Sequence, residues 1–120
     1  MPETMDPRGS WMREFPGRIV VCDGNGTILA MNDRAEQDFA NSGGRGLIGS
    51  NVLDCHPQPA RSQLERQLET GQVNAYTVEK KGVRRLIYQA PWYIGGQYSG
   101  LVELSLEIPH RLPHFDRDSS

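Results

Sequence analysis

The segment from residue 18 to residue 39 constrains the fold more than any other part of the sequence. Residues 19–22 and 27–30 are two short runs with strand character, and Asp-Gly-Asn-Gly separates them at positions 23–26. Glycine and asparagine adopt positive φ angles at low cost, so this tetrapeptide predicts a turn and the two runs a β-hairpin. Asn32 or Asp33 can then cap a helix in which Ala35 and Phe39 face the core. A hairpin followed at once by a capped helix predicts an α+β domain.

Length and charge limit the functions open to the chain. Its 120 residues leave room for one domain with a single modest core. Thirteen basic and fifteen acidic residues give a net charge of −2, which favours neither nucleic acid nor an anionic membrane surface as a partner. No run has the apolar length of a signal peptide core or a membrane span. We therefore expect a cytoplasmic protein with no nucleic-acid partner and no membrane partner.

Residues 1–14 predict an N-terminal leader that contains a short helix. Asp6 followed by Pro7 suits a helix start, and Trp11 and Phe15 are four residues apart, so they share one face. Pro16 and Gly17 end this helix. The two aromatic side chains are available for a contact made by the leader.

The rest of the chain predicts one connecting helix and three strands. Glycines between residues 43 and 49 favour loops and turns, and Pro57 and Pro59 can open a helix that Gly71 stops. Residues 74–80, 84–93 and 98–108 have strand character and are separated by short glycine turns. In the last of these strands apolar residues alternate with Glu103 and Glu107, which predicts an apolar face on the core and a polar outer face.

This order of elements resembles the PAS fold. The resemblance is carried by the Asp-Gly-Asn-Gly turn, by Asn32 at the start of the first helix and by Leu47-Ile48-Gly49, which leads to the His56-Pro57 entry of the connecting helix; Pro91 and Gly100 add to it. It covers residues 15–108, with residues 109–120 as a C-terminal tail, and the late strands are similar to small stand-alone PAS proteins of bacteria. It implies a five-stranded antiparallel sheet with short helices on one face.

The resemblance also implies a function in signal transduction. PAS domains act as sensory or regulatory modules that bind a small ligand, mediate protein–protein association, or both. We expect a homodimer with no output domain of its own, in which Trp11, Phe15 and the outer face of the sheet form the dimer surface. Two alternatives remain: a ligand-free dimerisation and interaction module, and a small cone-shaped α+β enzyme. We expect no enzyme, because the sequence assembles no nucleophilic triad, carboxylate pair or phosphate loop.

The candidate pocket follows from the same resemblance. Successive residues on a strand point to opposite faces, so Tyr88 and Trp92 share one face of their strand while Gln89 lies on the other, and only one set can line a cavity. The candidate ligand-binding residues are Phe39, Leu53, His56, Leu64, Tyr76, Tyr88, Gln89, Trp92 and Leu104.

Cofactor chemistry depends on three consecutive residues before the connecting helix. His56 could ligate haem iron from that position, although a helix-start role is favoured. Cys55 is expected to be a buried thiol and Asp54 a helix cap, and Asp54, His56 and Tyr88 would be the acid/base set of the enzyme alternative.

Flavin photochemistry is disfavoured, because Val52 stands where light-sensing LOV domains carry their reactive cysteine. No cysteine spacing matches a zinc site, and the ligand stays unassigned.

Overall fold

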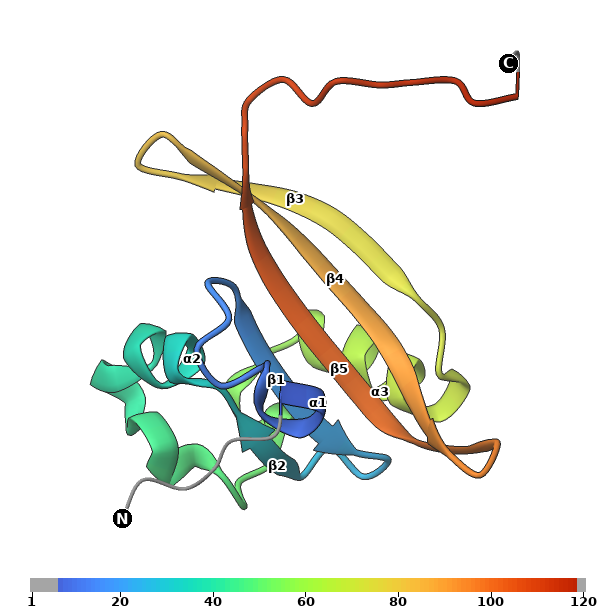
Figure 1. Ribbon diagram of the computed structural model, residues 1–120. Helices are drawn as coiled ribbons and strands as arrows, with labels where there is room; N and C mark the ends of the chain where they lie inside the picture. The colour runs from blue at the N-terminus through green and yellow to red at the C-terminus, as the bar shows by residue number, and fades with distance from the viewer. Residues whose placement is uncertain (1–6, 119–120) are drawn as a thin grey trace.

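All five strands belong to one antiparallel sheet in the order β2-β1-β5-β4-β3. The computed structural model describes residues 7–118. The first hairpin is inserted beside the last strand, which confirms the predicted α+β architecture (Figure 1). The elements are α1 (Pro7–Ser10), β1 (Arg18–Asp23), β2 (Ile28–Met31), α2 (Asp33–Asp38), the 3-10 helices η1 (Ala40–Ser42), η2 (Gly44–Leu47) and η3 (Val52–Cys55), then α3 (Ala60–Thr70), β3 (Asn74–Lys80), β4 (Val83–Ile94) and β5 (Gln97–Ile108).

The turn between β1 and β2 is held by its own side chain. The Asp23 carboxylate accepts hydrogen bonds from the backbone N–H groups of Asn25 at 2.9 Å and Thr27 at 3.0 Å. Gly26 has a φ angle of 90°, in the region that favours glycine. The predicted hairpin therefore forms by the expected turn chemistry.

Asn32 joins the leader, β1 and α2. Its buried side chain oxygen accepts from the N–H of Ala35 at 3.1 Å, which caps α2, and from the N–H of Ile19 at 3.0 Å. The side chain amide donates to the carbonyls of Gly17 at 2.8 Å and Met12 at 3.0 Å. The cap is thus Asn32, and Asp33 is the first helical residue. The predicted Asp6 cap of α1 lies outside the described residues.

The connecting segment differs from the sequence prediction in one respect. Helix α3 ends as predicted, because Gly71 adopts a left-handed conformation with φ 66°. Asp54 is wrong as a helix cap: it lies within η3 and is exposed. Asn51 caps η3 instead, accepting from the N–H of Leu53 at 2.9 Å, and Pro59 at the start of α3 makes no side-chain cap.

The two long hairpins of the second half extend the sheet beyond the helices. Every residue of β3 is exposed, and β4 contributes one buried hydrophobic side chain, Ile87. One core cluster joins Cys22, Leu68 and Leu101, and another joins Ile28, Met31 and Ala35. The core therefore lies over β1, β2 and the middle of β5.

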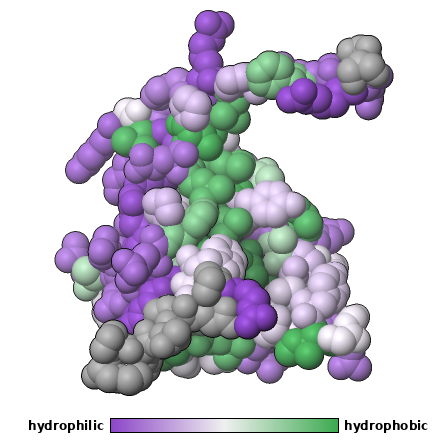
Figure 2. Space-filling model, in the orientation of Figure 1, coloured by the Kyte–Doolittle hydropathy of each residue, from purple (hydrophilic) through white to green (hydrophobic). Residues whose placement is uncertain are grey.

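The two faces of β5 are reversed relative to the prediction. Leu101 and Glu103 point to the side of α2 and α3, so the apolar set that includes Leu104 and Leu106 lies on the outer face, the sheet face away from these helices. Figure 2 shows apolar side chains gathered along the long strands on the viewer's side. The leader reaches this outer face, because a Cβ added at Gly17 would meet both Phe15 and Leu106.

Candidate functional site

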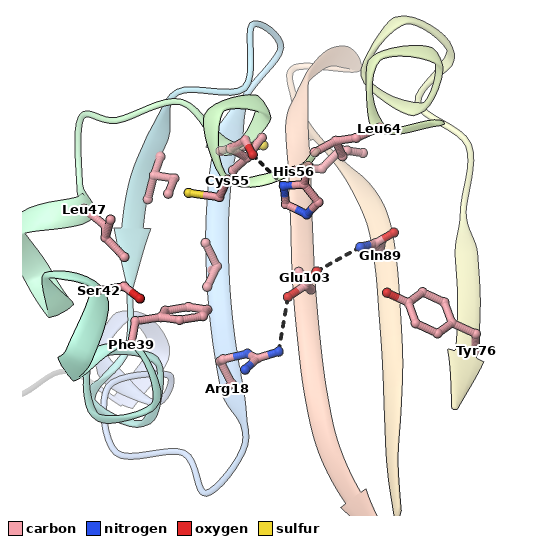
Figure 3. A pocket seen from close by; sticks show the side chains of 15 residues that line it. Arg18, Phe39, Ser42, Leu47, Cys55, His56, Leu64, Tyr76, Gln89 and Glu103 are labelled. Atoms are coloured by element: carbon pink, nitrogen blue, oxygen red, sulfur yellow. Dashed lines mark hydrogen bonds and ion pairs between the residues drawn. The ribbon is translucent and has the colours of Figure 1, made fainter. Parts of the chain in front are cut away.

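A cavity of about 430 Å³ lies between the inner face of the sheet and the segment from α2 to α3 (Figure 3). This volume is within the range of small-molecule sites, about 300–1,000 Å³. Most of the lining is apolar, with polar side chains concentrated on the sheet. The lining residues are Arg18, Val20, Cys22, Ile28, Phe39, Ser42, Leu47, Val52, Cys55, His56, Leu64, Tyr76, Gln89, Leu101 and Glu103.

A row of polar side chains crosses the inner face of the sheet. The register places Glu103 of β5 opposite Gln89 of β4, and Gln89 opposite Asn74 of β3. The Gln89 amide donates to the Glu103 carboxylate at 2.8 Å, and its oxygen accepts from the Asn74 amide at 3.1 Å. Gln89 therefore has both ends of its amide engaged and fixes the orientation of Glu103.

Arg18 extends the polar row onto β1. Its guanidinium lies 3.6 Å from a carboxylate oxygen of Glu103 and 3.6 Å from one of Asp38. The same group stacks over the Phe39 ring, 5.0 Å from the centroid. Its Nε–H is buried and has no hydrogen-bond partner among the described residues. The two ion-pair distances exceed hydrogen-bond length, so the terminal N–H groups of the guanidinium keep capacity to donate to a ligand acceptor.

His56 lies across the cavity from this row and has one ring nitrogen engaged. Its Nδ1 is 2.6 Å from the Val52 carbonyl oxygen, so Nδ1 carries the proton and donates. In the neutral ring Nε2 is then an acceptor, and Figure 3 shows it turned toward the cavity. Cys55 is exposed and lines the same cavity, so its prediction as a buried thiol is wrong.

Two further groups at the cavity stay protonated at neutral pH. Partial burial raises the pKa of the Tyr76 hydroxyl, and the negative charge of Glu103 raises it further. Burial likewise raises the pKa of the Cys22 thiol. Tyr76 points from β3 toward the polar row and can donate a hydrogen bond there (Figure 3).

The structure brings together only part of the predicted pocket. Phe39, His56, Leu64, Tyr76 and Gln89 line the cavity. Of the remaining candidates, Leu53 packs against the core cluster of Cys22, Leu68 and Leu101.

The other three predicted pocket residues, Tyr88, Trp92 and Leu104, do not line the cavity. Tyr88 and Leu104 face each other in the β4–β5 register and lie on the outer face, because their neighbours Gln89 and Glu103 point inward. Trp92 instead donates from its indole N–H to the carbonyl of Cys22 at 3.0 Å. The acid/base set of Asp54, His56 and Tyr88 is therefore not assembled, since Tyr88 and His56 are on opposite sides of the sheet.

Sequence reasoning missed the two charged residues of the site. Arg18 was passed over, and Glu103 was assigned to the outer face. No local sequence signal places Glu103 in the cavity, because its inward orientation follows from the register that sets it opposite Val20 of β1 and Gln89 of β4.

Two features are not found in the described part of the chain, a metal-binding cluster and a membrane-spanning helix. Residues 7–118 contain no group of three or more histidine, cysteine or acidic side chains placed to hold a metal ion. No helix within that range has the length and apolarity needed to cross a membrane.

Solved structures of low sequence identity share this architecture, whereas no family model and no curated protein matches the sequence. The PAS domain of BvgS from Bordetella pertussis aligns with a TM-score of 0.61 at 22% identity, over 84% of this chain and 83% of that one. The Aer2 receptor of Vibrio cholerae, described as a dual PAS-haem oxygen sensor, aligns at 0.56 and 14% identity over 78% and 95%. VqmA bound to DPO aligns at 0.61 and 17% identity over 84% of this chain and 56% of that one.

Proposed function

We propose that this chain, which has a PAS fold, is a sensory domain that binds a small organic molecule in the cavity and signals by changing its association with protein partners. The observation that carries the proposal is the cavity itself, which combines apolar side chains with a few oriented polar groups. That combination is typical of ligand pockets, where the apolar surface supplies affinity and the polar groups fix orientation. We place the protein in the cytoplasm, where Cys22 and Cys55 stay free thiols.

The position of the cavity supports a signalling role. It is lined on one side by the compact first half, through residues such as Val20 and Phe39, and on the other by the exposed second half, through Tyr76 and Gln89. A ligand that contacts both halves binds more tightly when they are held in one arrangement, so its binding shifts the population of arrangements. A partner that contacts the long hairpins would sense that shift.

Native mass spectrometry tests whether the cavity holds a small molecule. We expect a retained organic mass in protein incubated with a small-molecule extract of cells that express it, and loss of that mass on denaturation. Ser42→Trp adds an indole to an exposed residue that lines the cavity, and we expect it to abolish the retained mass. Asn41→Trp, at an exposed neighbour outside the cavity lining, is the matched control and should keep it. Wild-type protein that carries no small molecule would favour a ligand-free interaction module.

Haem is a second candidate because His56 presents an acceptor nitrogen to the cavity. The Val52 carbonyl orients the ring by its bond to Nδ1, as a carbonyl commonly does behind a metal-binding histidine. Bound haem would supply gas-binding or redox chemistry at iron. A Soret absorption band that disappears in His56→Ala would establish this candidate, and a haem-loaded protein without any spectral change in that variant would remove His56 as the ligand.

The dimer surface is proposed to include the leader. The Trp11 and Phe15 rings pack edge to face with centroids 5.9 Å apart, and Trp11 remains 57% exposed. An exposed aromatic beside an apolar sheet face suits association with a second copy. Sedimentation of the double variant Trp11→Glu, Phe15→Glu should show a smaller species than wild type, whereas an unchanged species would place the dimer surface elsewhere.

A further inference from the structure

The charges around the cavity define what kind of ligand the polar row can accept. Among the lining residues Arg18 and Glu103 carry opposite formal charges and lie beside each other, with 3.6 Å between guanidinium nitrogen and carboxylate oxygen. Asp38 adds a second carboxylate to the same guanidinium at 3.6 Å. A ligand carboxylate would compete with these two acceptors and be repelled by Glu103. For a ligand ammonium, repulsion by Arg18 offsets attraction by Glu103, and Asp38 is not among the residues that line the cavity.

Two neighbouring groups of the polar row can still form hydrogen bonds with a ligand, one as a donor and the other as an acceptor. Arg18 lines the cavity, and its terminal N–H groups, which lie 3.6 Å from their carboxylate partners, can donate to a ligand carbonyl. Glu103 accepts from Gln89 through one oxygen only, so its carboxylate has capacity for a ligand N–H. Gln89 is engaged by Asn74 and Glu103 and offers little to a ligand. The two available groups thus match a molecule that carries a carbonyl next to an N–H.

The rest of the lining suits a flat apolar body. Phe39 lies under the guanidinium and continues the surface away from it, and Val20, Leu47, Leu64 and Leu101 line other parts of the cavity. His56 Nε2 supplies one acceptor on the far side. We propose that the cavity selects an uncharged carboxamide or lactam on an apolar body, with its carbonyl on Arg18 and its N–H on Glu103. This inference rests on the proposed small-molecule function.

Three probes that share a naphthalene ring and differ in one substituent test the selection. 2-Naphthamide offers a carbonyl and an N–H, methyl 2-naphthoate a carbonyl alone, and 2-naphthoate a charged carboxylate on the same ring system. Titration followed by two-dimensional NMR should give the order amide, ester, carboxylate, with the amide about ten-fold tighter than the carboxylate. Shifts should concentrate at Val20, Gln89 and Glu103.

Two glutamate variants separate the role of Glu103 from general effects of charge. Glu103→Gln should weaken 2-naphthamide binding about ten-fold, because the ligand N–H then donates to a neutral oxygen instead of a carboxylate. The difference in affinity between 2-naphthamide and 2-naphthoate should become smaller, since the negative charge that repels the carboxylate is also removed. Glu107→Gln, the same change on the same strand outside the cavity lining, should leave both affinities unchanged. A dispersed spectrum for each variant shows that it is folded.

Each result decides one of the two proposals. If 2-naphthoate binds as tightly as 2-naphthamide, or if Glu103→Gln leaves the order unchanged, the selection for an uncharged amide is overturned while the small-molecule function stands. If no probe binds, the selection is overturned, and if native mass spectrometry also finds no retained molecule, the small-molecule function is overturned with it.

Discussion

The two halves of the sheet are built differently. In the first half, β1 and β2 each contribute buried residues to the core, and Asn32 joins them to the leader and α2 by hydrogen bonds to five backbone groups. In the second half β3 is exposed along its whole length, although the strands are longer. The cavity lies between the halves and is lined by both. Under the proposed function, a ligand in this cavity would contact a well-packed half and an exposed half, so its binding would shift the arrangement of one half relative to the other.

The substitution with the largest expected effect on stability is at Gly100, where the two halves of the sheet join. Gly100 of β5 pairs with Asp23 of β1, has a φ angle of 145°, and an added Cβ would overlap the Cys22 carbonyl and lie 2.7 Å from the Asp23 Cα. We expect Gly100→Ala to cost about 4 kcal/mol or more, because the clash is with backbone and cannot be relieved by a side chain. Gly96→Ala, at an open turn with φ 82°, should cost about 1 kcal/mol. Circular dichroism with urea measures both, and equal costs would show that the two strands can separate freely here.

The same substitution at two asparagines compares the halves directly. Asn32→Ala removes two accepted and three donated backbone hydrogen bonds, and we expect a loss of about 3 kcal/mol in the free energy of unfolding. Asn74→Ala removes one exposed bond to Gln89 and should cost about 0.5 kcal/mol or less. Urea denaturation followed by tryptophan fluorescence gives both values. A cost for Asn74→Ala as large as that for Asn32→Ala would contradict the comparison.

Hydrogen exchange compares the local stability of the two halves of the sheet in the wild-type protein. Amides of β1 that pair with β5 should exchange about ten-fold more slowly than amides of β3 that pair with β4, which corresponds to about 1.4 kcal/mol of local opening free energy. The reason is that β1 has strands on both sides, whereas β3 is an exposed edge. Equal protection in β1 and β3 would mean that the sheet opens as one unit.

Local sequence chemistry was enough to predict most of the fold. The Asp-Gly-Asn-Gly turn, the stop at Gly71 and the glycine turns of the second half each act within a few residues, and the strands begin and end close to the predicted positions. The sequence predicted Asn32 or Asp33 as the helix cap, and the structure selects Asn32; its bonds to Met12 and Gly17 could not be predicted because they span long sequence distances.

The site was harder to predict because it depends on register between distant strands. Alternation in β5 shows two faces without saying which faces the helices, and the apolar set was assigned to the core. The leader, with Phe15 near Leu106, lies over part of the other face, so apolar residues are useful on both sides. Glu103 becomes a cavity residue only once β1 and β4 are known to flank β5, and the pairing with Arg18 follows from that.

A crystal structure of the protein grown with 2-naphthamide would show directly whether the cavity binds a small molecule. We expect density for the probe in the cavity, with its carbonyl oxygen within hydrogen-bond distance of the Arg18 guanidinium and its nitrogen within hydrogen-bond distance of the Glu103 carboxylate. Crystals grown with and without the probe that both show the space filled by Phe39, Leu64 and Tyr76 would contradict it, because the domain would then be an interaction module with no ligand site.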